Sequence, residues 1–215
     1  MTTSKATPRL LLLIATSGLV ACTGSLFDSE ALLNRIYVLA PAAATPASTT
    51  PVPLDIVISE PKAAPGLATE RIAVLYPDRH LEYYAGARWG SSSTEVVQSL
   101  VVGSLRNQRS FRSVTAAPSG TAATHVVDIE LRDFQAEYAS AGALPTIRVS
   151  LVANVLRLKD RRLLAVVPAS ATVTARENRV TEVVAAFEAA TQQVAAALGR
   201  ETAVAVAGDI GGSTP

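Results

Sequence analysis

HVVDIEL at residues 125–131 and IRVSLVANV at residues 147–155 are the stretches that decide the fold of this chain. In both, apolar side chains alternate with polar ones, which is the period-two pattern of a strand with one buried and one solvated face. Residues 159–162 (KDRR) form a charged turn, and residues 163–174 predict a strand that returns from it. We therefore expect an antiparallel sheet at the centre of the fold.

Shorter apolar segments upstream extend this pattern. They predict strands at residues 54–58, 71–76, 80–85 and 111–114. Pro77 and Asp78 are turn residues that join the second and third of these strands into a hairpin. Ser92 and Glu95 have the S-x-x-E spacing of a capping box, so a helix is predicted to begin there. The apolar face of that helix consists of Val97, Leu100, Val101 and Leu105.

A second helix is predicted near the C-terminus, with Asn178 as its N-cap and Gly199 as its stop. Its apolar stripe consists of Val180, Val183, Val184, Phe187, Thr191, Val194 and Leu198. Residues 199–215 are expected to form a flexible tail. The predicted fold is α+β, over residues 54–198: a two-layer sandwich in which two amphipathic helices cover one face of a mostly antiparallel sheet.

The N-terminal residues have the features of an export signal. Lys5 and Arg9 precede an apolar run that is about half the roughly 20 residues needed to span a bilayer as a helix. The run ends in Leu19-Val20-Ala21-Cys22, which resembles the lipobox of bacterial lipoproteins. Cys22 is also the only cysteine in the chain. The alternative is an ordinary signal peptide with a cysteine at this position by chance.

The lipobox divides the first quarter of the chain into two parts. Residues 1–21 are predicted to be a lipoprotein signal peptide, and residues 22–53 a lipidated tether followed by an Ala/Pro-rich linker. Cys22 would carry a diacylglyceryl group and an N-acyl chain such as palmitate. An aspartate after the cysteine often retains such proteins in the inner membrane. Because Thr23 follows Cys22 here, we expect the periplasmic face of the outer membrane rather than the inner membrane.

Composition argues against several classes of function. The 215 residues include 19 basic and 18 acidic side chains, so charge alone indicates no nucleic-acid groove. His80 and His125 are the only histidines, and neither has further ligands at metal-binding spacing. An acidic row along one strand is interpreted as a solvated face rather than a catalytic pair; it consists of Asp128, Glu130, Asp133 and Glu137. We predict a protein that is not an enzyme, with no metal and no cofactor besides the lipid on Cys22.

Aromatic residues concentrate at the end of the predicted hairpin, although they make up only 5% of the chain. Tyr83, Tyr84, Arg88 and Trp89 lie within seven positions there. Tyr, Trp and Arg are enriched where proteins bind one another, so these four residues are a candidate partner-binding site. The alternative is that Trp89 fills the junction between the hairpin and the first helix.

The run from Leu81 to Trp89 (LEYYAGARW), following Arg71, resembles the signature of the ABC-type transport auxiliary lipoproteins. Residues 37–41 (YVLAP) are similar to a Tyr-x-Leu-x-Pro segment that follows the lipobox in that family. The resemblance extends from about Cys22 to Leu198. It implies an accessory component of an MCE-type lipid transport system, in which a cytoplasmic ATPase and a permease work with an MCE-domain protein.

The implied partners are the membrane, through the lipid anchor, and the MCE-domain protein with its permease and ATPase. The domain would dock on that assembly or handle phospholipid cargo, and a homo-oligomer stays open. The alternative function is an envelope lipoprotein of structural or assembly type, which acts purely as an adaptor between proteins.

Overall fold

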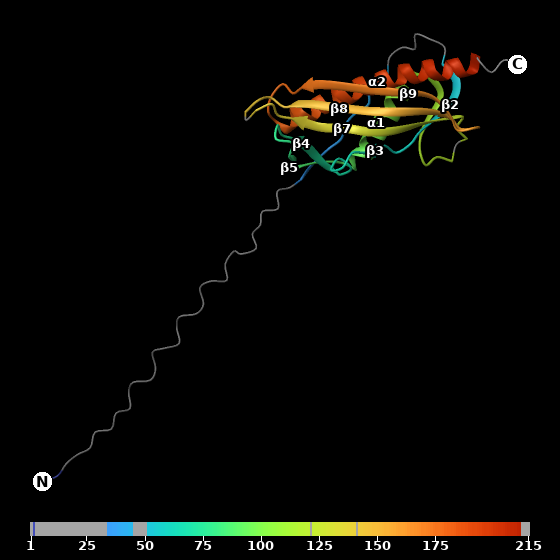
Figure 1. The fold of residues 1–215 in the computed structure, drawn as a ribbon. Helices are drawn as coiled ribbons and strands as arrows, with labels where there is room; N and C mark the ends of the chain where they lie inside the picture. Colours follow the sequence, from blue (N-terminus) through green and yellow to red (C-terminus); the bar gives the residue numbers. More distant parts are fainter. Residues whose placement is uncertain (1, 3–33, 45–50, 121, 141, 212–215) are drawn as a thin grey trace. The chain divides into compact units, whose positions relative to one another are not determined.

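Three long antiparallel strands dominate the computed structural model, which describes residues 2, 34–44, 51–120, 122–140 and 142–211. They are β7 (His125–Glu137), β8 (Thr146–Arg157) and β9 (Arg162–Thr174), and they run side by side in Figure 1. The apolar half of the HVVDIEL alternation is buried, whereas the carboxylates of Asp128 and Glu130 face outward. The central antiparallel strands predicted from the sequence are confirmed. Cys22 and the predicted signal peptide lie outside the described residues.

The other edge of β7 is occupied by three short strands that follow one another along the chain. They are β2 (Val52–Ile58), β3 (Lys62–Ala63) and β4 (Arg71–Leu75), and all three run parallel to β7. β2 pairs with the beginning of β7, at His125–Val127, and β4 pairs with its end, at Gln135–Glu137. The two ends of β7 therefore carry different neighbours.

Three further strands complete the sheet at its two ends. β6 (Phe111–Ala116) runs parallel to β2, β5 (Leu81–Trp89) antiparallel to β4, and β1 (Arg35–Tyr37) parallel to β5. Among the described residues, five pairs of neighbouring strands are parallel and three are antiparallel. The sheet is therefore mixed, and the prediction of a mostly antiparallel sheet is wrong. β2 and β4 are nearly continuous apolar runs, which is the pattern of strands in parallel sheets.

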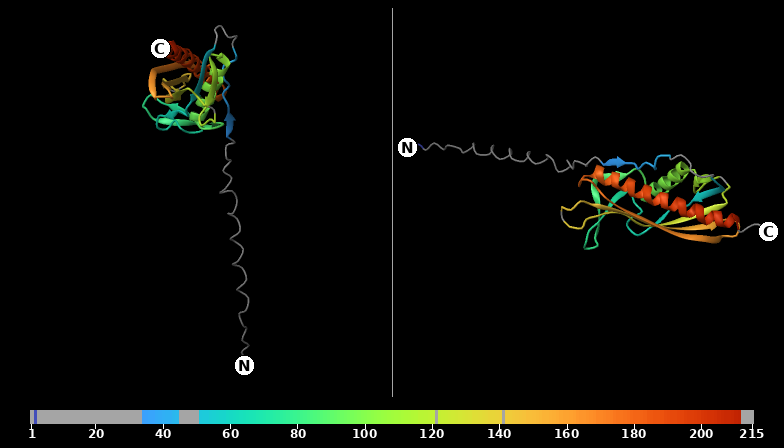
Figure 2. Two further views of the ribbon diagram at one scale, coloured as in Figure 1. Left: turned by 90° about the vertical axis from the view of Figure 1, so that its right-hand side faces the viewer. Right: turned by 90° about the horizontal axis from the view of Figure 1, so that it is seen from above.

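Two helices complete the α+β fold. α1 (Ser93–Gln108) begins at the predicted capping box, where the amide of Glu95 donates to the hydroxyl of Ser92 at 3.3 Å. α2 (Val180–Gly211) is longer than predicted and contacts β8, β9 and α1. Figure 2 shows α2 lying along the length of the long strands. The carbonyl of Arg179 accepts the first hydrogen bond of the helix, from the amide of Val183 at 3.0 Å, so Arg179 is the N-cap and the prediction of Asn178 is wrong.

Gly199 does not end α2, and the predicted flexible tail is helical as far as Gly211. Gly199 lies inside the helix and faces α1, where a Cβ would come within 2.3 Å of the side-chain oxygen of Gln108, so that flexible side chain would have to move. Thr202 and Val206, in the turns that follow, are fully buried. A local sequence pattern cannot distinguish a glycine that stops a helix from one inside a helix that continues.

The core contains three aromatic rings. Trp89 lies with its ring centroid 5.6 Å from Phe134 of β7 and 5.1 Å from Phe187 of α2. The centroids of Phe134 and Phe187 are 4.9 Å apart, and all three side chains are at most 1% exposed. Burying such rings contributes several kcal/mol each. The cluster therefore links β5, β7 and α2 in one hydrophobic core.

Part of the predicted tether belongs to the folded domain. We call residues 35–42 the N-terminal strap. After β1, the amide of Ala40 donates to Glu188 of α2 at 2.7 Å, and Gln192 returns a bond to the carbonyl of Ala40 at 2.9 Å. Asn107 of α1 donates to the carbonyl of Ala42 at 2.7 Å. Side chains of both helices thus form hydrogen bonds with backbone groups of the strap, which in a mobile linker would be solvated by water.

Candidate functional site

An open groove of about 700 Å³ lies where the β4–β5 hairpin meets the end of β7 and the start of β8. We call it the hairpin-end groove. Its lining residues are Leu75, Tyr76, Pro77, Arg79, Asp133, Glu137, Tyr138, Ala139, Thr146 and Arg148. The volume lies within the range of about 300–1,000 Å³ that is typical of binding sites for small ligands or side chains.

The register of the parallel strands builds the aromatic wall of the groove. Leu75 of β4 lies opposite Glu137 of β7, and each strand is followed at once by a tyrosine. Because parallel strands end at the same edge of the sheet, Tyr76 and Tyr138 come together, with their rings stacked at 5.8 Å. Tyr76 also stacks on His80 of the hairpin turn, at 4.5 Å between ring centroids.

A chain of hydroxyl groups fixes this wall to the domain. Tyr138 donates to the Oδ1 of Asn178 at 2.7 Å, and its hydroxyl is 2.9 Å from that of Tyr84. Since Tyr138 uses its proton on Asn178, Tyr84 is the donor to Tyr138. Burial, followed by this hydrogen bond, raises the pKa of Tyr84 well above its usual value of 10.0. The Tyr84 hydroxyl therefore keeps its proton at any physiological pH.

Paired charges form the second wall. Arg148 of β8 donates to both carboxylate oxygens of Glu137, at 2.8 and 3.1 Å, and this pairing raises the pKa of Arg148. Gln135 donates to Asp133 at 3.0 Å and to Glu137 at 3.2 Å. Ser150 donates to the other oxygen of Asp133. A bulge in β7 after Leu131 keeps these carboxylates on the outer face.

Only one of the four residues predicted to bind a partner reaches this network. Tyr84 does so through its hydroxyl. Tyr83 donates instead to the carbonyl of Gly66 at 3.0 Å and lies under the guanidinium of Arg71, 3.8 Å from the ring centroid. Arg88 forms an ion pair with Glu70. Trp89 has no exposed area, so the alternative interpretation of it as a core residue agrees with the structure.

Sequence reasoning missed Tyr76, Tyr138 and Arg148 as members of one site. A signal for the two tyrosines was present, since each directly follows a strand, but only the parallel register of β4 and β7 places them side by side. Arg148 was assigned to the solvated face of its strand. The structure places it there, with its guanidinium paired to a carboxylate of the neighbouring strand.

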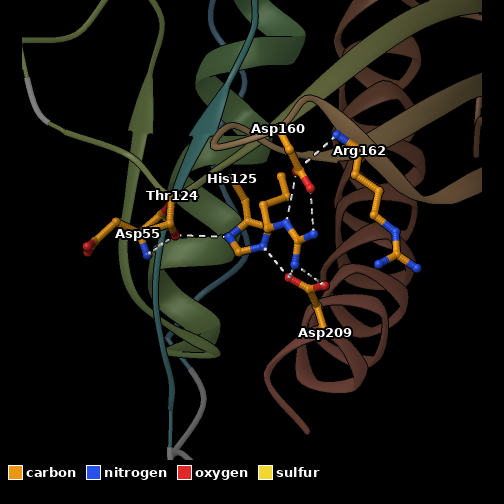
Figure 3. A network of polar contacts seen from close by, with 7 residues as sticks. Asp55, Thr124, His125, Asp160, Arg162 and Asp209 are labelled. Carbon is orange, nitrogen blue, oxygen red and sulfur yellow. Dashed lines mark hydrogen bonds and ion pairs between the residues drawn. The ribbon is translucent and has the colours of Figure 1, made fainter. Parts of the chain in front are cut away.

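The second histidine belongs to a different polar network, at the opposite end of β7 (Figure 3). His125 is 3% exposed, with Nδ1 2.9 Å from the hydroxyl of Thr124 and Nε2 3.5 Å from a carboxylate oxygen of Asp209. Arg157 donates to the same carboxylate at 2.8 and 3.1 Å and also binds Asp160. The network attaches the last turns of α2 to β7 and β8, which explains why the helix continues beyond Gly199.

The described residues contain no group of three or more His, Cys, Asp or Glu side chains placed to hold a metal ion. Within the same part of the chain, no helix combines the length and the apolar character needed to cross a membrane. The hairpin-end groove offers aromatic faces, hydroxyl donors and paired charges, which are groups suited to recognition.

The sequence matches a family described as the ABC-type transport auxiliary lipoprotein component over residues 37–199. The chain belongs to this family. The match begins in the N-terminal strap, so the strap is part of the family's domain. The family is one of transport-auxiliary lipoproteins, and membership associates the protein with the cell envelope. No enzyme family is indicated, and no curated protein matches the sequence.

Two solved structures share the fold of this auxiliary lipoprotein. A protein from Xanthomonas campestris, described as a member of the DUF330 family, is 25% identical, with a TM-score of 0.73 over 81% of this chain and 98% of that one. A second, uncharacterised protein is 13% identical, with a TM-score of 0.61 over 77% of this chain and 96% of that one. The second likeness concerns the fold alone.

Proposed function

We propose that this auxiliary lipoprotein is a lipid-anchored accessory component of an MCE-type ABC lipid transport system, and that its hairpin-end groove docks on the MCE-domain protein. Family membership supports the transport part of the proposal. The observation that carries the docking part is the groove itself, in which Tyr76 and Tyr138 stand beside Arg79 and an ion-paired wall. Tyrosine and arginine are enriched among the few residues that provide most of the binding energy at protein interfaces.

The rigidity of the aromatic wall suits it to docking. Tyr138 is held by hydrogen bonds to Tyr84 and Asn178, so a partner would not have to immobilise it on binding. Preorganised groups lose less conformational entropy when a complex forms. The wall therefore offers an incoming protein a fixed shape.

The anchor of this proposal is Cys22, which would carry the diacylglyceryl and N-acyl groups on the periplasmic side of the envelope. Two or more acyl chains hold a protein stably at a membrane. Because Thr23 follows Cys22, we place the protein at the outer membrane in preference to the inner membrane. The N-terminal strap would connect this anchor to α1 and α2, since its backbone is bonded to both helices.

Site-specific crosslinking in the native host tests the docking role. A photoreactive amino acid at position 76 of the full-length protein should give a covalent adduct with an MCE-domain protein. The same amino acid at the exposed position 166 of β9, which pairs with Asn154 and lies outside the groove lining, should give no such adduct and serves as the matched control. Equal adducts at both positions would contradict docking through the groove. An adduct only with an envelope protein lacking an MCE domain would favour the adaptor function.

A further inference from the structure

A second groove, of about 480 Å³, lies at the end of α1, against β2 and β6. We call it the arginine groove, because Arg106, Arg109 and Arg112 line it together with an apolar surface that includes Phe111, Val114 and Pro51. None of the described residues that line it carries a carboxylate. The arginine groove thus combines guanidinium groups with an apolar floor.

The charges of the arginine groove are not balanced. Arg112 is paired with Asp55 through two hydrogen bonds, one of them 3.0 Å long, and this pairing lowers the pKa of that carboxyl to about 2. Arg106 uses its Nε to donate to the carbonyl of Val114 at 2.7 Å, which leaves the two terminal nitrogens of its guanidinium for other partners. With the Arg112 charge compensated, Arg106 and Arg109 give the groove an excess of positive charge.

The backbone at Arg109 adds an independent observation. This residue caps α1 in the left-handed conformation, with φ 54° and ψ 30°. Helices usually place glycine at this position, because a side chain there is strained by about 1 kcal/mol or more. Attraction to the negative end of the helix accounts for a basic residue in the last turn, such as Arg106. The same attraction does not explain why arginine, and not glycine, occupies position 109, where the left-handed backbone disfavours any side chain.

We propose that the arginine groove binds the headgroup of an anionic phospholipid, with the phosphate on Arg106 and Arg109 and the first methylenes of the lipid over Phe111 and Val114. Arginine binds phosphate with two parallel hydrogen bonds, and the apolar floor lies beside the guanidinium groups. This inference rests on the proposed transport role and adds to it a binding site and a preference for a net negative headgroup. Its test uses no partner protein, so it can fail or succeed separately from docking.

Calorimetric titration tests the proposal on the whole chain carrying Cys22→Ser, which cannot receive a lipid. The probes are dihexanoyl phosphatidylglycerol below its critical micelle concentration, dihexanoyl phosphatidylcholine, and inorganic phosphate. Phosphatidylglycerol should bind at least tenfold more tightly than either of the others, because it alone combines a net negative headgroup with acyl chains. Its binding should also weaken as salt is raised.

The decisive variant is Arg109→Gly. It removes the guanidinium and at the same time relieves the left-handed backbone, so the domain should unfold at the same or a higher temperature while phosphatidylglycerol binding weakens at least tenfold. Arg161→Gly is the matched control. Arg161 also has a positive φ, of 56°, and lies in the turn between β8 and β9, outside the groove lining. This variant should bind phosphatidylglycerol as tightly as the parent chain.

Four results would overturn the inference. The first is that phosphatidylglycerol does not bind at millimolar concentration, and the second is that Arg109→Gly binds it as tightly as the parent does. The third is that inorganic phosphate binds as tightly as the lipid, which would indicate a site for a free anion. The fourth is that a hexaglutamate peptide binds as tightly as phosphatidylglycerol, which would indicate a docking site for an acidic protein segment.

Discussion

The two grooves lie at opposite ends of β7 and differ in their charge balance. In the hairpin-end groove, Arg148 is matched to Glu137, and the stacked tyrosines are tied into hydrogen bonds. In the arginine groove, no carboxylate among the described lining residues balances the positive charges of Arg106 and Arg109. Matched charges hold a surface in shape, whereas an excess of one sign attracts a ligand of the other. The difference assigns shape recognition to one end and anion recognition to the other.

Different neighbours of the same strand produce this contrast. At its end, β7 pairs with β4, and the parallel register places a tyrosine after each strand at a common edge. At its beginning, β7 pairs with β2, which brings β6 and the end of α1 to the second groove. Substitutions in the core and at each end should therefore have separable effects on stability and binding.

Trp89→Ala should affect both ends together. The side chain is fully buried against Phe134 and Phe187, so its removal should lower the free energy of unfolding by about 3–5 kcal/mol. Urea denaturation followed by circular dichroism measures this loss, because the variant lacks the only tryptophan. Arg88→Ala, at the adjacent residue with a surface ion pair to Glu70, should lower it by less than about 1 kcal/mol. Similar losses in both variants would contradict a core role for Trp89.

Tyr138→Phe should affect the hairpin end alone. It keeps the stacked ring but removes the hydroxyl that joins Tyr84 to Asn178, and should lower the free energy of unfolding by about 1–2 kcal/mol. Crosslinking from position 76 should weaken, while phosphatidylglycerol binding at the other end stays unchanged. The control is Tyr83→Phe, which loses one bond to the carbonyl of Gly66. A change in lipid binding in Tyr138→Phe would show that the two ends are coupled.

Arg112→Gln should give the smallest effect, and one that depends on pH. The pair with Arg112 lowers the pKa of Asp55 from 3.8 to about 2, so its stabilisation is present above pH 4 and is lost as pH falls through about 2. The parent should be more stable than the variant at pH 7, and the difference should shrink steadily between pH 4 and pH 2. In the variant, the Asp55 pKa measured by NMR should rise toward 3.8. A constant difference from pH 7 to pH 2 would show that the charge pair is not its source.

The sequence predicted those elements whose signals are local. The alternation in residues 125–131 and 147–155 predicted two long strands and the capping box predicted the start of α1, because each pattern depends on residues a few positions apart. The grooves could not be predicted in the same way. Tyr76 and Tyr138 are 62 positions apart, and only strand pairing brings them together. For Trp89 the sequence left a partner-binding role and a core role open, because composition does not distinguish burial from exposure, and its complete burial decides for the core.

Local patterns in the sequence were sufficient for the α+β class, the long antiparallel strands and the family resemblance, and they predict an export signal that ends at Cys22. These depend on periodicity, capping and motif, which are properties of neighbouring residues. Three features became visible in the folded chain alone: β2, β3 and β4 run parallel to β7, the N-terminal strap is bonded to both helices, and α2 continues past Gly199. Each of these depends on contacts between distant segments, whose free energy no local pattern records.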